Sequence, residues 1–126
     1  MSFTIDAIME KISMWLTTGE VDANIFSEDF QFISPFHKQK NKAVFLEDFK
    51  HKTFYRDSIL SSIVKFDPVI SLKSNDGNNF AIVLQYHTKN GHSVWETVLG
   101  KVDAVGLLVE MRSIYDLEAT KKALEL

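Results

Sequence analysis

The last third of the chain is the part that most limits what this sequence can fold into. Segments 79–87, 93–102 and 107–116 are rich in strand-forming residues, and two short turn signals separate them. This pattern predicts three antiparallel strands joined by tight turns. Helical patterns come earlier in the chain, and such segregation is typical of an α+β domain. We therefore predict a cone-shaped, curved antiparallel sheet wrapped around N-terminal helices.

The first half of the chain predicts those helices. Thr4 is a suitable N-cap, and apolar residues then recur at helical spacing until Gly19, which is a suitable residue to end the helix. Asn41 is expected to cap a further helix whose apolar face includes Phe45. The other predicted elements are a short helical piece at 21–26, a strand at 30–34, extended segments at 59–66 and 69–74 with a break at 67–68, and a terminal helix at 117–126.

Length and composition fit one domain that covers residues 1–126. With 45% apolar and 12% aromatic residues, including ten Phe, the chain can build a full core and line a cavity. The net charge is −3 and acids and bases are mixed, so no nucleic-acid partner is expected. The basic cluster at 37–42 is short and is interpreted as a solvated loop.

The sequence also excludes several kinds of site. It has no cysteine, so neither disulfides nor thiolate sites are available. Its four histidines lack metal-ligand spacing, and no phosphate-binding motif is present, so no metal and no cofactor are expected. The N-terminus lacks a signal-peptide pattern, and no stretch approaches the roughly 20 apolar residues of a membrane span. We expect a cytoplasmic protein without membrane contact.

The turn at 103–106 predicts which side chains share a face of the sheet. A four-residue loop sets Glu96 opposite Ser113. Their face, which we expect to line a ligand pocket, also carries Val94, Val98, Met111 and Tyr115. The other face carries Trp95, Thr97, Leu99, Lys101, Leu108, Glu110, Arg112 and Ile114. That second face is too apolar for open water and too charged for a core, so we predict a homodimer that forms through it.

The turn at Asn90 and Gly91 allows two registers. A two-residue loop puts Gln85 opposite Glu96 and brings His87 to the pocket face, and the Asn-Gly pair favours it. A three-residue loop puts a different set on that face, namely Phe80, Ile82, Leu84 and Tyr86. The apolar alternation of this set favours the second register. We take the first register as the prediction and keep the second as the alternative.

Glu96 is the main candidate for chemistry, because a carboxylate desolvated in a pocket has a raised pKa and can act as a general acid or base. His87 is a candidate proton shuttle beside it. The predicted ligand-contacting residues are Trp15, Ser34, Tyr55, Gln85, Met111, Ser113 and Tyr115. The alternatives are a structural, hydrogen-bonded role for Glu96, a solvent-facing strand end for His87, and core packing for the aromatic residues and Met111.

The order of these features resembles the nuclear transport factor 2-like superfamily, and within it the small bacterial SnoaL-like and ketosteroid-isomerase-like proteins. The resemblance rests on the helix that ends at Gly19, the segments 29–35 and 66–69, the turn at 89–91 and the segment 110–116. It covers nearly the whole chain and implies a cystatin-like fold. It implies no single reaction, because this superfold hosts isomerases, dehydratases, cyclases, epoxide hydrolases and non-catalytic domains.

Three positions argue against the ketosteroid isomerase reaction. The resemblance places that family's catalytic base at Ser34, its oxyanion-hole tyrosine at Ile12 and its protonated aspartate at Val98. These side chains can neither remove a carbon-bound proton nor donate to an oxyanion in the required way. SnoaL-type cyclases have an acid near the end of the sheet, for which Glu96 and Asp116 are available, although Asp116 also suits the N-cap of the terminal helix.

The sequence therefore predicts a small-molecule-binding protein with a mostly apolar pocket, whose partner is a small, mostly apolar molecule. One alternative is a lyase, isomerase or cyclase that uses Glu96 as general acid–base together with His87. The other alternative is a protein-association module in which phenylalanine side chains plug the pocket.

Overall fold

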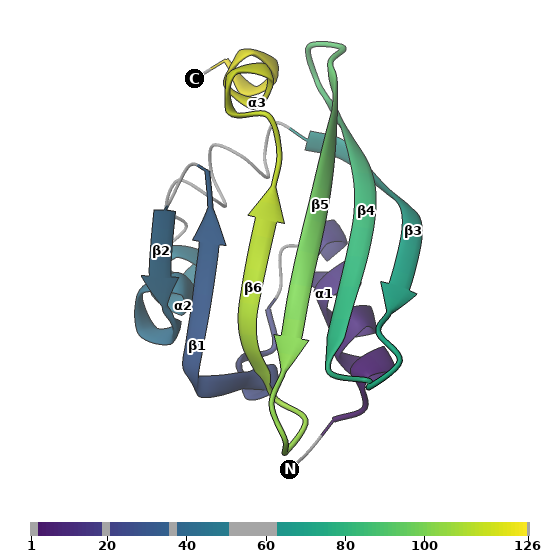
Figure 1. The fold of residues 1–126 in the computed structure, drawn as a ribbon. Coiled ribbons are helices and arrows are strands. Elements are labelled where there is room, and N and C mark those ends of the chain that lie inside the picture. Colours follow the sequence, from purple (N-terminus) through teal and green to yellow (C-terminus); the bar gives the residue numbers. More distant parts are fainter. Residues whose placement is uncertain (1–2, 19–20, 36–37, 51–62, 126) are drawn as a thin grey trace.

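The main element of the structure is one six-stranded sheet that is curved and does not close on itself (Figure 1). This computed structural model describes residues 3–18, 21–35, 38–50 and 63–125. The strands are β1 (Phe26–Ser34), β2 (Lys38–Asn41), β3 (Ile63–Lys73), β4 (Asn79–Thr88), β5 (Ser93–Val102) and β6 (Leu108–Ile114). They lie in the order β2-β1-β6-β5-β4-β3, and neighbours are antiparallel except β1 and β6, which are parallel. The predicted α+β class is confirmed.

Helices α1 (Ile5–Thr18) and α2 (Lys42–Lys50) begin at the predicted caps. The backbone N–H of Ala7 donates to Thr4 Oγ1 at 3.1 Å, and that of Val44 donates to Asn41 Oδ1 at 2.9 Å. These bonds satisfy donors that the first turn of a helix leaves unpaired.

The C-terminal segment forms the predicted terminal helix, α3 (Leu117–Leu124). Asp116 is its N-cap, since its Oδ1 accepts a hydrogen bond from the Ala119 N–H at 2.9 Å. A short 3₁₀ helix, η1 (Ala23–Ile25), corresponds to the piece predicted at 21–26. Within the part of the chain that the structure describes, every helix is too short or too polar to cross a membrane.

Helices α1 and α2 lie on the same side of the sheet, which we call the inner face (Figure 1). Helix α1 contacts β3 and β4, and α2 contacts β1 and β2. Ile8, Ile12 and Trp15 recur along one side of α1, and all three are buried. Phe45 of α2 is fully buried, and its ring centroid lies 4.9–5.7 Å from those of Trp15, Phe26, Phe30 and Phe32. Aromatic packing therefore fills the core between α1, α2 and β1.

Two parts of the sheet differ from the prediction. Residues 38–41 form the edge strand β2, which pairs with β1, rather than a solvated loop. Lys, Gln and Asn are weak strand formers, so the pattern could not indicate a strand that is held by backbone pairing. Strand β3 continues through Asp67 and Pro68, where a break was predicted. Its pairing with β4 shifts between Pro68 and Ile70, so an edge-strand bulge accommodates the proline.

The β4–β5 hairpin has the alternative register, and the two-residue loop that we preferred is wrong. Leu84, rather than Gln85, pairs with Glu96. The N–H of Thr88 donates to the carbonyl of His92 at 2.9 Å, so residues 89–91 form a three-residue loop. Gly91 takes a φ of +83°, the left-handed conformation that ends such a loop. The alternating set on the inner face is buried, namely Phe80, Ile82, Leu84 and Tyr86.

The β5–β6 pairing is displaced by two residues from the predicted one, because Val98 rather than Glu96 lies opposite Ser113. The register changes next to Lys101, where a β-bulge gives β6 one extra residue. A displacement of two leaves the predicted faces of Glu96 and Ser113 unchanged. Leu108 precedes the bulge and is fully buried in the core, so its predicted position on the opposite face is wrong.

Candidate functional site

The candidate site is the part of the inner face around Glu96, on β5. Its neighbours along the strand, Val94 and Val98, are 5% and 2% exposed, and Leu84 across the strand is 1% exposed. Strand alternation therefore holds the Glu96 side chain among apolar groups, while the residue itself stays partly exposed. Ser113, on β6, is buried and donates a hydrogen bond to the carboxyl group.

Burial raises the pKa of Glu96 from its ordinary 4.5 to about 7, and the hydrogen bond from Ser113 opposes only part of this shift. The cause is the loss of water that would stabilise the carboxylate charge. Near neutral pH the side chain therefore exchanges between a form that donates a hydrogen bond and one that only accepts. A general acid or base needs this property.

Tyr86 interacts with the charge of Glu96, and Thr120 lies next to Tyr86. The alternative register placed Tyr86 on the pocket face, whereas Thr120 was assigned to no site. Burial raises the pKa of Tyr86 to about 12, and the charges of Glu96 and Tyr115 act in the same direction, whereas Thr120 lowers it. Thr120 Oγ1 is buried and makes no hydrogen bond of acceptable distance and angle with the described residues. We therefore treat Tyr86 as a close neighbour of Thr120 and not as its established hydrogen-bond partner.

The other predicted ligand-contacting residues are spread over the inner side. Met111 on β6 and Ser34 at the end of β1 are 2% and 4% exposed. Trp15 is 4% exposed and packs edge-on against Phe45, so it belongs to the aromatic core. Tyr115 follows β6 and is partly buried, near Tyr86. Tyr55 lies outside the described residues.

Gln85 and His87 do not share the face of Glu96, which corrects the prediction for both. In the three-residue-loop register they pair with Trp95 and Ser93, on the face opposite α1 and α2. His87 is consequently unavailable as a proton shuttle for Glu96. Among the described residues, no three His, Asp or Glu side chains lie together in a way that could hold a metal ion.

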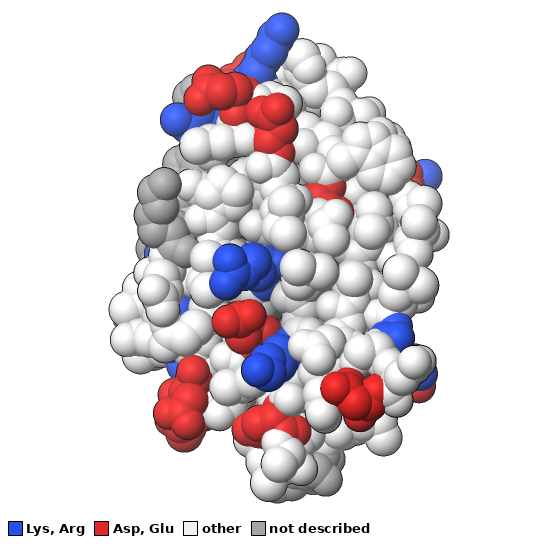
Figure 2. All heavy atoms as spheres, viewed as in Figure 1, with Lys and Arg blue, Asp and Glu red and all other residues white. Residues whose placement is uncertain are grey.

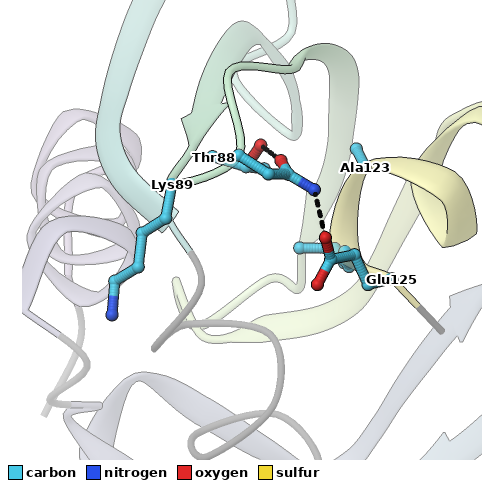
Figure 3. Close-up of a pocket in the computed structure, with 6 residues that line it drawn as sticks. Thr88, Lys89, Ala123 and Glu125 are labelled. Carbon is cyan, nitrogen blue, oxygen red and sulfur yellow. Dashed lines mark hydrogen bonds between the residues drawn. The ribbon is translucent and has the colours of Figure 1, made fainter.

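A small cavity of about 140 Å³ lies between the β4–β5 loop and the end of α3 (Figure 3). Its lining residues are Thr88, Lys89, Asn90, Ala123, Leu124 and Glu125. The Asn90 side-chain amide donates to Glu125 Oε1 at 3.2 Å, and Lys89 extends away from this pair (Figure 3). Ligand pockets usually measure roughly 300–1,000 Å³, so we interpret this cavity as a packing gap where α3 contacts the hairpin.

The outer face of the sheet, opposite α1 and α2, combines apolar and charged side chains. Figure 2 shows it in the same view as Figure 1, with a small central group of charges within a largely uncharged surface. Trp95, Leu99 and Ile114 are 55%, 38% and 48% exposed there. Lys101 lies opposite Glu110, and Leu99 lies opposite Arg112, in the β5–β6 pairing.

Comparisons with known proteins identify the fold and nothing finer. No family model matches the sequence, and no curated protein matches it significantly. A steroid delta-isomerase from Pseudomonas aeruginosa is similar in structure, with a TM-score of 0.74 at 14% identity over 99% of this chain and 91% of that chain.

Two further solved structures are similar over most of both chains. An NTF2-like protein of unknown function from Cytophaga hutchinsonii has a TM-score of 0.62 at 17% identity, covering 94% of each chain. The epoxide hydrolase/cyclase-like enzyme SalBIII of salinomycin pyran ring formation has a TM-score of 0.60 at 16% identity, over 88% of this chain and 92% of its own. Identities this low establish a shared fold, whereas the two activities named among these proteins, steroid isomerisation and pyran ring formation, differ from each other.

Proposed function

The chain has the nuclear transport factor 2-like fold, and we propose from this fold and from the position of Glu96 that it binds a small, mostly apolar molecule on the inner face. One observation carries the proposal. The carboxyl group of Glu96 is desolvated among buried apolar side chains, and yet the residue is partly exposed, so a ligand could reach it. A carboxyl group in such surroundings is costly unless hydrogen bonds compensate it. A ligand with an apolar body and one polar group would add such a bond.

The hydroxyl groups near Glu96 indicate what the polar group of the ligand would be. Ser113 on β6 donates to Glu96, Tyr86 on β4 interacts with its charge, and Thr120 on α3 lies next to Tyr86. Hydroxyl groups both donate and accept hydrogen bonds. A ligand hydroxyl or carbonyl oxygen therefore matches this set.

A second candidate function is acid–base catalysis of the lyase, isomerase or cyclase type. The observation that favours it is the pKa of about 7 for Glu96, since a catalytic acid or base works best when its pKa lies near the operating pH. His87 takes no part in this version, because it lies on the outer face. Tyr86 is an ionisable group that interacts with the charge of Glu96, and its pKa of about 12 keeps it protonated, as a hydrogen-bond donor, at neutral pH.

A third candidate is a protein-association module. It is favoured by the packed rings around Phe45, which occupy part of the inner side, and by the exposed apolar residues of the outer face. Independently of the ligand, we propose that two copies of the chain associate through the outer face around Trp95, Leu99 and Ile114. Large exposed apolar areas are usually covered in an assembly. Around a two-fold axis, the basic and acidic side chains beside this area can also pair with the opposite charges of the second copy.

The test is a thermal-shift screen of the wild type against small apolar alcohols, ketones and carboxylic acids, repeated with Glu96→Gln. A ligand that binds only the folded state stabilises it by about 2.7 kcal/mol at 100 times Kd. The matched control is Glu10→Gln, because Glu10 is an exposed residue of α1 outside the proposed dimer interface. We expect the wild type and Glu10→Gln to be stabilised by the same compounds, and Glu96→Gln to be stabilised less.

The outcomes separate the three candidates. Stabilisation that depends on Glu96 supports binding at the inner face, and turnover of the same compound would then support catalysis. Stabilisation that is equal in Glu96→Gln and the wild type would place the ligand elsewhere and contradict the proposal. Complete absence of stabilisation, together with a concentration-dependent self-association, would favour the association module.

A further inference from the structure

A serine, a histidine and an aspartate form a hydrogen-bonded row on the outer face, away from Glu96. They come from three adjacent strands: Ser93 begins β5, His87 lies near the end of β4, and Asp67 lies within β3. Ser93 pairs directly with His87, and Asp67 pairs with the neighbouring Gln85. The row lies beside the β4–β5 loop, beyond the exposed patch of Trp95, Leu99 and Ile114.

The distances fix the direction in which a proton can move along this row. His87 Nε2 lies 2.8 Å from Asp67 Oδ2, and His87 Nδ1 lies 2.8 Å from Ser93 Oγ. An ionised carboxylate can only accept, so His87 Nε2 must carry the hydrogen of that bond. In the neutral imidazole the lone pair then lies on Nδ1, where it accepts the hydrogen of the Ser93 hydroxyl.

Asp67 is held in its ionised form. The hydrogen bond from His87 is the largest cause that lowers the pKa of Asp67, and Lys65 adds to the effect. Lys65 Nζ lies 3.2 Å from Oδ1, the oxygen that does not face His87. Asp67 therefore has one oxygen oriented by Lys65 and the other available to fix the histidine tautomer.

We propose that Ser93 is a nucleophile that accepts acyl groups from small activated esters, with His87 as its general base and Asp67 as the group that orients His87. Ser93 is exposed, and the side chains of His87 and Asp67 are 31% and 37% exposed, so a reagent can reach the hydroxyl. The row lies on an open sheet face, so a suitable ester is small and intrinsically reactive. This inference does not depend on the ligand proposed for the inner face.

The reaction has two balanced steps. In the first, Ser93 Oγ forms a bond to the carbonyl carbon, its proton passes to His87 Nδ1, and the carbon–oxygen bond to the leaving group breaks, which releases the alcohol or phenol after it takes up a proton. In the second, water attacks the acyl carbon, His87 removes a proton from that water, and Ser93 Oγ leaves with a proton as the carboxylic acid forms.

The test uses p-nitrophenyl acetate and the full chain. Acetyl-Ser93 is located by mass spectrometry of digested protein, and p-nitrophenol release gives the rate. General-base catalysis contributes roughly 10²–10⁴-fold, so we expect His87→Gln to lower the acylation rate about 100-fold and Ser93→Ala to abolish the modification. His92→Gln, which changes a histidine of the same hairpin outside the row, is the matched control and should leave the rate unchanged.

Circular dichroism of each variant establishes that it is folded, and Asp67→Asn gives a further, milder variant with an expected intermediate rate. Modification of Ser93 that depends on His87 and Asp67 supports the proposal. Acetylation that falls on lysine residues instead, or a Ser93 rate that is the same in His87→Gln and the wild type, overturns it. Failure at Ser93 would leave the proposed function of the Glu96 face unaffected, because the two regions lie on opposite faces.

Discussion

The two faces of strands β5 and β6 share one backbone and both carry apolar side chains, but only the inner face is buried. On the inner face, Val94 and Val98 are buried and surround one carboxyl group, Glu96, whose pKa is raised to about 7. On the outer face, Trp95 and Leu99 are 55% and 38% exposed beside paired charges. The comparison teaches that residue type alone does not decide burial here. Apolar side chains are buried on the face that the helices cover and exposed on the other face. Strand alternation determines which face each side chain is on.

The largest expected effect comes from breaking the inner side where it is most tightly packed. Phe45 is fully buried against four aromatic rings, so Phe45→Ala should lower the free energy of unfolding by about 3–5 kcal/mol. Val44, the preceding residue of α2, is 47% exposed, and Val44→Ala should change it by less than about 0.5 kcal/mol. Urea denaturation of both variants measures the contrast. Equal losses would mean that α2 does not cover the sheet as described.

The pH dependence of stability tests whether Glu96 belongs to the inner face. Between its ordinary pKa of 4.5 and the raised value of about 7, the folded state binds more protons at Glu96 than the unfolded state does. The free energy of unfolding should therefore fall as pH rises through this window, by about 1–3 kcal/mol. Glu96→Gln should lose this dependence. The free energy of unfolding of the variant minus that of the wild type should therefore be larger at pH 8 than at pH 4.

Denaturant titrations at several pH values from 4 to 8 give this comparison, with Glu10→Gln, at an exposed position of α1, as the control. A wild-type slope that persists in Glu96→Gln would show that other groups cause it.

The outer face should respond in association rather than in stability. If two copies meet there, Leu99→Asp should raise the dimer dissociation constant at least about 10-fold, which corresponds to roughly 1.4 kcal/mol. Val105 is 61% exposed but lies in the β5–β6 turn, so Val105→Asp should leave association unchanged. Sedimentation at a series of concentrations measures both. A wild type that stays monomeric at all concentrations would contradict the proposed interface.

The smallest expected effect concerns the loop that assigns side chains to the two faces. Gly91 has a φ of +83° and no atom near the position of an added Cβ, so Gly91→Ala introduces only backbone strain, of about 1–2 kcal/mol. Gly91→Asn should cost less, because Asn tolerates this conformation better. Thermal denaturation compares the two. A Gly91→Ala variant as stable as the wild type would argue against the three-residue loop.

Much of the fold could be predicted because local signals agree with it. The caps at Thr4 and Asn41, the apolar stripe of α1 and the closing meander all follow from short-range patterns. Strand β2 could not be predicted, because its pairing with β1 depends on backbone groups and not on its side chains. The bulge in β3 could not be predicted either, since a proline such as Pro68 is as typical of a break between strands as of a bulge in an edge strand.

The sheet face was predicted correctly for Glu96 and Ser113 and wrongly for two residues of β4. Glu96 and Ser113 were assigned correctly to one face, because the pairing is displaced by two residues in all. One of these comes from the turn, after which Val102 pairs with Leu108 instead of Leu107, and the other comes from the bulge beside Lys101. Gln85 and His87 were assigned wrongly, because a loop longer by one residue exchanges the faces of a whole strand. The Asn-Gly pair favoured the two-residue loop, whereas the apolar alternation that ends at Tyr86 favoured the three-residue loop that the structure has.

The most direct test of the account is a carbon-13 NMR titration of the glutamate carboxyl groups in the wild type and in Glu96→Gln. We predict one carboxyl resonance in the wild type that titrates with a pKa of about 7, and its absence from the variant. A wild type in which every glutamate titrates near the ordinary value of 4.5 would contradict the central claim. Glu96 would then be a solvated side chain, and the inner face would hold no group poised for a ligand or for acid–base chemistry.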